Sequence, residues 1–209
     1  MTVARDGTMV PSRKMMVMPR WEPDTTQRLV AAAVDLFNEQ GYDATTVAQI
    51  AERAGVTKST FFRHFADKRE LLAAGQAALS RLMAEGIAGA PAGASPLEAV
   101  AAGLERASGA MGRQSRELGP RIKAAVAASA ELQERDALKS VGLAAAMTEA
   151  LVARGVPDPV AQVAGELGVL AFKRGFAAWS EGDRRGEQDL ARHALAALEE
   201  LRAAAGALG

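Results

Sequence analysis

The sequence predicts an all-α protein with about nine helices. Alanine, leucine, glutamate and arginine, which are strong helix formers, dominate the 209 residues, and aromatic residues make up only 4%. Ser, Thr and Asp followed three positions later by Glu or Gln recur before apolar runs, a spacing typical of helix N-termini. We expect a short-helix domain over residues 24–72, a longer helical domain over 73–209 and a preceding arm at 1–23.

Composition and charge narrow the class of protein. The chain has no cysteine, which excludes disulfides, thiolate metal sites and cysteine nucleophiles and fits a reducing cytoplasm. The formal net charge is zero, so any contact with nucleic acid must be local. No apolar run approaches the roughly 18 residues of a membrane span, and the start lacks the apolar stretch of a secretory signal. We expect a soluble, cytoplasmic protein with no membrane contact, metal or cofactor.

Residues 1–23 contain three prolines and no helical period, so we expect a flexible, mildly basic arm. Two interpretations stay open. Met1 could lie upstream of the true translation start, which would then be Met18, or the arm could be an extension that contacts DNA. Its charged residues are Arg5, Arg13, Lys14 and Arg20 against Asp6 and Glu22.

The domain over residues 24–72 is predicted to be a three-helix helix-turn-helix domain, followed by the start of a fourth helix, all with well-defined ends. Gly41 and Gly55 end the first two, because glycine accepts the left-handed conformation that follows many helices. The fourth begins with the apolar pair Leu71 and Leu72 and is expected to continue into the second domain. The predicted N-termini are the capping pairs Asp24 with Gln27, Thr46 with Gln49 and Asp67 with Glu70, and Thr57 caps the third helix.

The second domain begins after the loop over residues 90–95. Ser95, Pro96 and Glu98 give a cap, a first-turn proline and a capping box, so a helix is expected there. The break from Gly155 to Pro159 is the clearest boundary among the later helices. These helices are predicted at about 117–128, 131–154, 159–181 and 187–205.

The segment from Thr45 to Leu72 has the pattern of a helix-turn-helix. Such a corner needs a small residue where the helices cross, a glycine with positive φ and an apolar plug, and Ala51, Gly55 and Val56 fill these places. From residue 57 to 69, four basic residues face one acid, a local charge of +3. The following helix begins with side chains suited to base edges and phosphates, namely Lys58, Ser59, Thr60 and Arg63.

The same segment resembles the N-terminal domain of the tetracycline-repressor (TetR) family. The resemblance covers Asp24 to Leu72, about a quarter of the chain. It depends on Ile50-Ala51, Ala54-Gly55-Val56, Thr60-Phe61, His64-Phe65 and Lys68. It implies that Thr46 caps the second helix and touches phosphate, that Lys58 and Ser59 contact bases, and that Thr60, Phe62, His64 and Lys68 grip the DNA backbone. With Thr57 and Arg63, these residues form the predicted DNA-binding set.

Two positions depart from the family pattern. Position 59 is often glycine in the family and is Ser59 here, which adds a hydroxyl that could read a base or serve as a cap. Position 62 is commonly tyrosine and is Phe62 here, so a hydroxyl bond to phosphate is lost while the ring can still pack against a sugar edge.

The sequence argues against an enzyme. His64 and His193 are the only histidines, Tyr42 is the only tyrosine, and no Ser/His/Asp grouping, HExxH motif or phosphate loop accompanies them. We therefore predict no catalytic and no metal-binding residues, a phosphate contact for His64 and a structural role for His193.

Two apolar stripes in the last two helices favour a homodimer, with packing inside the chain as the alternative. The resemblance implies a second domain that binds an effector and dimerises, and a palindromic operator requires two-fold symmetry. We expect a four-helix interface from two copies of this helix pair. The stripes are Val160, Val163, Ala164, Leu167, Leu170 and Ala171, and Leu190, Ala194, Ala197, Leu198 and Leu201.

The effector site is the least defined prediction. Aromatic residues at i, i+4 and i+7 share a helix face that is either core or part of a ligand pocket or interface. The methionines could line an adaptable cavity or fill space in the core. A basic cluster around Gly119-Pro120, formed by Arg113, Arg116, Arg121 and Lys123, indicates an acidic ligand if it faces inward and a solvated face otherwise. The candidate ligand-binding residues are Met83, Met111, Arg121, Met147, Phe172, Phe176 and Trp179.

Together these patterns predict a DNA-binding transcriptional regulator, a ligand-responsive repressor that a small-molecule effector releases from double-stranded operator DNA. One alternative is a regulator whose second domain binds a partner protein. Another, from a different class, is a helical enzyme with an incidental helix-turn-helix.

Overall fold

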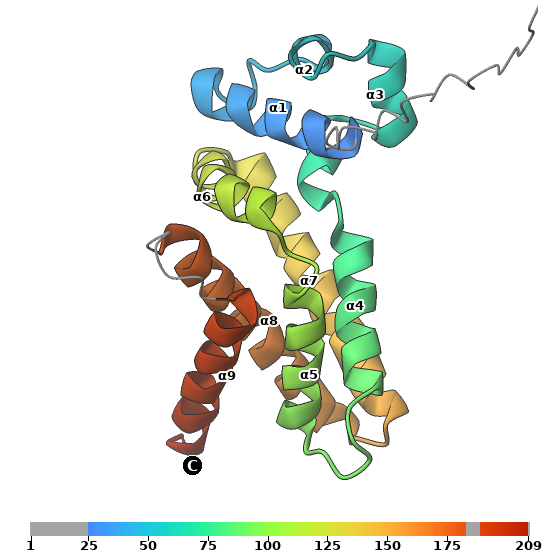
Figure 1. Cartoon of the computed structure of the whole chain (residues 1–209), viewed down its shortest axis with the longest axis vertical. Coiled ribbons are helices and arrows are strands. Elements are labelled where there is room, and N and C mark those ends of the chain that lie inside the picture. The colour runs from blue at the N-terminus through green and yellow to red at the C-terminus, as the bar shows by residue number, and fades with distance from the viewer. Residues whose placement is uncertain (1–24, 183–188, 209) are drawn as a thin grey trace, which may run out of the picture.

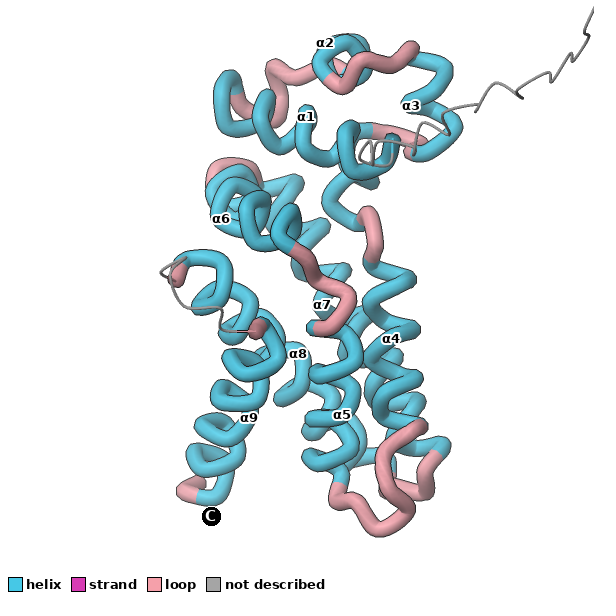
Figure 2. Tube along the Cα trace, in the orientation of Figure 1, coloured by secondary structure: helices cyan, strands magenta, loops and turns pink. Residues whose placement is uncertain are grey.

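The computed structural model describes residues 25–182 and 189–208, and all regular structure in these ranges is helical (Figure 2). Nine α-helices and one 3-10 helix in the described residues confirm the all-α prediction. The arm over residues 1–23 and the expected cap Asp24 lie outside them. The helices are α1 (Thr25–Gln40), α2 (Val47–Arg53), α3 (Lys58–His64), the 3-10 helix η1 (Lys68–Ala73), α4 (Gln76–Ala88), α5 (Pro96–Ser108), α6 (Arg113–Ala127), α7 (Ala130–Ala153), α8 (Asp158–Glu181) and α9 (Leu190–Gly206).

The helices are arranged in two parts along the long axis of the molecule (Figure 1). Helices α1, α2 and α3 lie at one end, and α4 to α9 form the remainder. Between the parts, α6 packs against α1, and η1 packs against α7. Within the second part, α4 packs on α5 and α7, and α8 packs on α7 and α9. A small helix-turn-helix domain is thus presented on a larger helical support, as the sequence predicts.

Local hydrogen bonds begin α2 and α3 where the sequence predicts. The Thr46 hydroxyl accepts from the backbone N–H of Gln49 at 3.3 Å, and the Gln49 side chain accepts from the Thr46 N–H at 2.9 Å, which completes a capping box. The Thr57 hydroxyl accepts from the Thr60 N–H at 3.1 Å. These bonds satisfy N–H groups that have no partner inside the helix. Residues within three positions of each other therefore fix the N-termini of both α2 and α3.

The fourth predicted helix is interrupted. Asp67 caps it as expected, but the segment is a 3-10 helix that ends at Ala73. Gly75 then adopts a left-handed φ of +78°, and α4 begins only at Gln76. No single straight helix therefore runs from the first domain into the second.

Contacts with α7 explain why η1 is tight and short. The Glu70 carboxylate pairs with Arg135 of α7, so it does not complete the capping box that the sequence predicts. Leu71 is fully buried beside Leu132 of α7. Both side chains turn η1 toward α7, and the chain needs the bend at Gly75 to continue into α4.

The apolar stripe of α9 is used inside the chain. Leu190, Ala194, Ala197, Leu198 and Leu201 are all buried in the core of the second domain. Gly175 of α8 makes the approach possible, because a Cβ there would lie 2.5 Å from the Cα of Ala194. These side chains therefore pack inside the chain, the alternative for this stripe, and the participation of α9 in a dimer interface stays a prediction.

The helix α6 begins four residues earlier than the sequence predicts, at Arg113, and it includes Pro120. A proline inside a helix removes one backbone hydrogen bond. Close packing on α8 accompanies this helix, because a Cβ at Gly119 would lie 2.8 Å from a ring carbon of Phe176. Among the described helices, none is long and apolar enough to cross a membrane.

Candidate nucleic-acid interface

The turn between α2 and α3 has the geometry that the sequence predicts. Gly55 takes a φ of +67°, and the backbone N–H of Val56 donates to the carbonyl of Ala51 at 2.9 Å. Ala51 is buried at the crossing of the helices. From α1, the Arg28 guanidinium donates to the carbonyl of Ala54 at 3.2 Å, which fastens the turn to the rest of the domain.

Helix α3 has one buried side and one open side. Phe61 is fully buried and packs against Phe65, with ring centroids 5.7 Å apart, which anchors the helix. On the open side, Phe62 is 53% exposed. The predicted DNA-contacting residues Thr57, Lys58, Ser59 and Arg63 are exposed as well, whereas Thr60 is half-buried with its hydroxyl 3.0 Å from that of Thr57.

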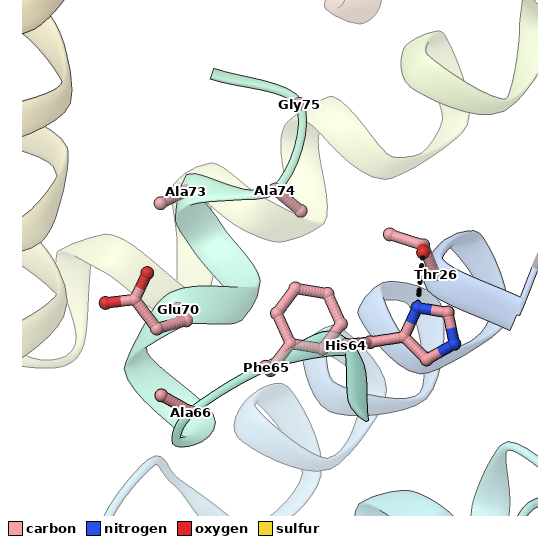
Figure 3. Close-up of a pocket in the computed structure, with 8 residues that line it drawn as sticks. All are labelled: Thr26, His64, Phe65, Ala66, Glu70, Ala73, Ala74 and Gly75. Carbon is pink, nitrogen blue, oxygen red and sulfur yellow. Dashed lines mark hydrogen bonds between the residues drawn. The ribbon is translucent and has the colours of Figure 1, made fainter. Parts of the chain in front are cut away.

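Thr46 and His64 stand at the two ends of this interface. Thr46 is exposed at the N-terminus of α2. His64 is exposed at the end of α3, and its Nδ1 lies 3.2 Å from the hydroxyl of Thr26 in α1 (Figure 3). Beside it a cavity of about 360 Å³ opens where α1, α3 and η1 meet, lined by Thr26, His64, Phe65, Ala66, Glu70, Ala73, Ala74 and Gly75.

Lys68 is placed differently from the other predicted contacts. Its ammonium group donates to the backbone carbonyls of Tyr42 at 2.7 Å and Thr45 at 3.0 Å, and it lies 4.0 Å from the centre of the Tyr42 ring. Lys68 therefore holds the loop between α1 and α2 in the structure. Its contact with the DNA backbone stays a prediction.

The open positive charge is smaller than the sequence count of +3, because the Lys68 ammonium group is bound to backbone carbonyls. Arg69 hydrogen-bonds Asp67 at 2.6 Å, and these bonds lower the pKa of the Asp67 carboxyl, so the two charges offset each other. Lys58 and Arg63 make no hydrogen bond or ion pair with any residue in the described ranges, so they remain available to phosphates. Two cations on the exposed side of α3, with His64 beside them, form a compact site for an anionic partner.

The structure does not gather the candidate ligand-binding residues around a described cavity. Met83 and Met147 are fully buried, and Phe172 and Trp179 are nearly so, within one hydrophobic core. Met111 and Phe176 pack half-buried against that core. The rings of Phe172 and Phe176 stack with centroids 6.1 Å apart. The core alternative for the aromatic stripe therefore fits the structure, and the role of these residues in ligand binding stays a prediction.

Arg121 and its basic neighbours contact other helices. The Arg121 guanidinium pairs with Asp35 of α1, and its carbonyl accepts from Asn38 at 3.0 Å. Lys123 pairs with Glu181 at 2.6 Å. Arg116 donates to the carbonyl of Trp179 at 2.9 Å, and Arg113 pairs with Glu117 within α6 at 2.8 Å. The cluster thus links α6 to α1 and α8. This role is neither the acidic-ligand site nor the solvated face that the sequence predicted.

One polar contact between the two domains was not predicted from the sequence. Tyr42 in the α1–α2 loop donates to Glu131 of α7 at 2.9 Å, and Arg69 lies 3.6 Å from the same carboxylate. Tyr42 and Glu131 are 89 positions apart. The only available signal was that Tyr42 is the single tyrosine of the chain.

Comparison with known proteins indicates the class of protein to which this geometry belongs. The family model described as bacterial regulatory proteins, tetR family, matches residues 29–74. The transcriptional regulator TcmR of Streptomyces glaucescens is 42% identical over 76 residues, which are 36% of this chain and 34% of TcmR. The class A tetracycline repressor from transposon 1721 of Escherichia coli is 42% identical over 55 residues, 26% of this chain and 24% of the repressor. The matches span about a third or less of these relatives.

Solved structures share the whole fold. A transcriptional regulator from Aquifex aeolicus has a TM-score of 0.51 at 20% identity, over 85% of this chain and 98% of that structure. FadR from Bacillus subtilis, in complex with stearoyl-CoA, has a TM-score of 0.52 at 18% identity, over 82% of this chain and 95% of FadR. At these identities the likeness concerns the fold alone.

The helix-turn-helix domain, its exposed helix α3 and the helical second domain define a transcriptional regulator of the helix-turn-helix class. Residues 29–74 match the tetR family of bacterial regulatory proteins, so the DNA-binding domain is of the tetR type. The relatives and solved structures reported above are regulators, which agrees with the prediction that the chain is not an enzyme.

Proposed function

We propose that the chain is a ligand-responsive repressor that binds a palindromic operator as a homodimer and is released by a small-molecule effector. The observation that carries the DNA contact is the open side of α3. Lys58, Ser59 and Arg63 are exposed together on a helix whose other side is anchored by Phe61. A helix presented in this way fits the major groove, where short and cationic side chains reach base edges and phosphates.

Selection of bound sequences from a random pool of DNA duplexes tests this proposal. We expect enrichment of a palindrome whose half-sites are about one helical turn apart, roughly 10 base pairs. Failure to bind any duplex at low ionic strength would contradict it.

The outward face of α8 supports pairing of two copies. Val160, Val163 and Leu170 are 46%, 60% and 41% exposed, with the half-buried Leu167 between them on the same face. Beside this face lies an open groove of about 510 Å³, lined mainly by apolar residues of α5 and α8. A second copy placed across α8 would remove this apolar surface from water and create the two-fold axis that a palindrome requires. Half of the predicted α8 stripe is thus available, whereas Ala164 and Ala171 are buried in the chain.

The effector would act by shifting a population. A ligand that prefers a conformation with a different spacing of the two α3 helices lowers the affinity for DNA. Bound DNA lowers the affinity for the ligand by the same factor. The FadR structure with stearoyl-CoA supports a small molecule as effector, because that protein has the same fold. Titration of the protein–DNA complex with candidate small molecules tests this, and release must be matched by weaker ligand binding in the presence of DNA.

A partner protein in place of a small molecule remains the second candidate. It is favoured by the dense packing of Met83, Met147, Phe172 and Trp179, which line neither of the two described cavities. If DNA release depended on an added protein and on no small molecule, this candidate would replace the first.

A further inference from the structure

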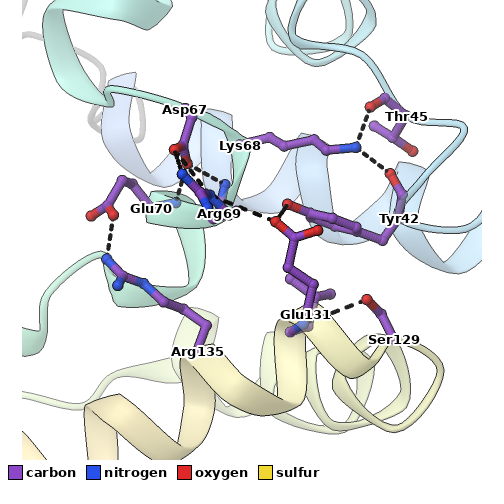
Figure 4. Close-up of polar contacts among 10 residues, drawn as sticks. Tyr42, Thr45, Asp67, Lys68, Arg69, Glu70, Ser129, Glu131 and Arg135 are labelled. Carbon is purple, nitrogen blue, oxygen red and sulfur yellow. Dashed lines mark hydrogen bonds and ion pairs between the residues drawn. The ribbon is translucent and has the colours of Figure 1, made fainter.

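Three connections join the DNA-binding helices to the second domain. The covalent connection runs through η1 and bends at Gly75, where φ is +78° and no side chain caps α4. A second is the packing of α6 on α1, with the ion pair between Arg121 and Asp35. The third is a set of polar contacts between the first domain and the first turns of α7 (Figure 4). Because a glycine bend holds the orientation of a domain poorly, these contacts must contribute to it.

Tyr42 is the central contact. Its ring is buried and packs edge-on against Phe37, with centroids 5.1 Å apart, while its hydroxyl leaves the core and donates to Glu131 at 2.9 Å. Burial and the neighbouring Glu131 carboxylate raise the pKa of the Tyr42 phenol, so it stays protonated and remains a donor at physiological pH. The hydrogen bond is charge-assisted, which makes it one of the stronger kinds.

The loop that contains Tyr42 is also the loop that begins α2. Lys68 binds the carbonyls at both ends of this loop, those of Tyr42 and Thr45, and Thr46 follows directly as the cap of α2. The loop therefore cannot shift at Tyr42 without moving the N-terminus of α2. Thr46 is the residue there for which the resemblance predicts a contact with phosphate.

Glu131 touches the first domain at a second point. Arg69 of η1 lies 3.6 Å from its carboxylate, and Arg69 is itself held by Asp67. One side chain in the first turn of α7 thus contacts both the α1–α2 loop and η1.

We propose that Tyr42 and Glu131 are positioning residues for DNA binding, through which the first turn of α7 holds the α1–α2 loop, and with it Thr46 and α3, in the orientation that meets DNA. The inference rests on the proposed function, and it gives the effector domain a point of control over the DNA-binding helices. Neither residue needs to touch DNA, because both act through the placement of α2.

Distance measurement between spin labels tests the inference without DNA. The chain has no cysteine, so Glu52→Cys on α2 and Glu149→Cys on α7, both at exposed positions, give one labelled pair per chain, and mixing with an excess of unlabelled chain isolates the distance within one chain. We expect one narrow distance distribution for the otherwise unchanged protein and a broad one after Tyr42→Phe or Glu131→Ala. Loss of stability alone would not broaden it at temperatures where the protein is fully folded.

DNA affinity supplies the second measurement. Each substitution is expected to weaken binding to the selected operator about tenfold, as for loss of one charge-assisted hydrogen bond, and the double variant no more than either single one. Glu134→Ala is the matched control, because Glu134 is exposed one turn further along α7 and makes no hydrogen bond or ion pair with a described residue. It should change neither measurement.

The outcomes separate the two proposals. Unchanged distances and unchanged affinity in Tyr42→Phe and Glu131→Ala would overturn the positioning role. Independent, additive losses of affinity would overturn it as well. Absence of DNA binding by the unsubstituted chain would instead refute the proposed function, and the spin-label distances would still decide whether α7 orients α2.

Discussion

Phe61 and Phe62 are neighbours in sequence with opposite environments. Phe61 is fully buried and Phe62 is 53% exposed. A helix places consecutive residues about 100° apart, so the first ring can anchor α3 while the second faces outward. The exposure of a ring beside Lys58 and Arg63 is explained if the ring packs against a sugar edge of DNA, the contact expected for Phe62 from the sequence.

Restoring a hydroxyl at this position should strengthen binding. Phe62→Tyr adds a donor that can reach a phosphate, and a net hydrogen bond changes affinity by roughly two- to tenfold. Equilibrium titration with operator DNA measures it. The control is Phe61→Tyr, which buries a hydroxyl in the core and should lower stability. Weaker binding by Phe62→Tyr would mean that the apolar ring itself contacts DNA and that the added hydroxyl does not reach the DNA backbone.

Ser59 and Arg63 should affect binding in different ways. Arg63→Ala removes a phosphate contact, so it should weaken binding to all sequences and reduce the slope of log affinity against log salt by about 0.9. Ser59→Ala should alter the preferred sequence and leave the slope unchanged. Titrations at several salt concentrations with operator and unrelated duplexes make the comparison, with Arg192→Ala, at an exposed position of α9, as the control. Identical behaviour of the two α3 variants would reject the assignment.

Lys68 should contribute to stability apart from any contact with DNA. Lys68→Met keeps the length of the side chain but removes the donors to the carbonyls of Tyr42 and Thr45. Two partly buried acceptors then lose a partner, and the free energy of unfolding should fall by about 1–3 kcal/mol. Chemical denaturation measures the loss. An unchanged midpoint would show that water replaces the ammonium group without cost.

At the scale of the elements, the ends of helices could be predicted where the cause is local. Thr46, Thr57 and Ser95 each cap a helix through a bond to a residue three positions on, so the sequence contains both partners side by side. The interruption of the fourth helix could not be predicted in the same way. It depends on Glu70 turning to Arg135, 65 positions away, and on Leu71 packing beside Leu132.

The bend between η1 and α4 should require glycine. Gly75→Ala places a Cβ on a residue with a φ of +78°, which costs roughly 1–2 kcal/mol in the free energy of unfolding. Gly206→Ala is the control, because Gly206 lies in α9 and a Cβ there meets no atom within 4 Å. It should be neutral or slightly stabilising. Thermal unfolding compares the two, and equal stability of both variants would show that the bend can relax into a helix.

At the scale of the whole molecule, the sequence predicted the DNA-binding side better than the effector side. Lys58, Ser59 and Arg63 lie on one short helix, so their common exposure follows from helical spacing alone. The effector side involves three helices, which contain Met83, Met147 and Trp179, and the periodicity of the sequence predicts only that each helix has an inward face. Which inward faces leave a space between them depends on packing of helices that are far apart in sequence, as does the contact from Tyr42 to Glu131.

The association of two chains should depend on α8. Val163→Glu puts a charge in the centre of its exposed apolar face, and burial of an unpaired charge is costly enough to prevent pairing. Sedimentation at micromolar concentration should then show a monomer where the unsubstituted chain shows a dimer. Leu208→Glu, at an 89% exposed residue after α9, is the control and should leave the dimer intact. A dimer that survives Val163→Glu would move the interface to another surface.

The burial of the α9 stripe within its own chain has a consequence for dosage. Because Leu190, Ala194 and Leu198 already complete the core, each chain has a finished fold before it meets another. If pairing uses only the outer face of α8, free monomers are a stable reservoir, and operator occupancy rises with the square of the protein concentration below the dimer dissociation constant. A modest change in expression would then produce a disproportionate change in the transcription of its target.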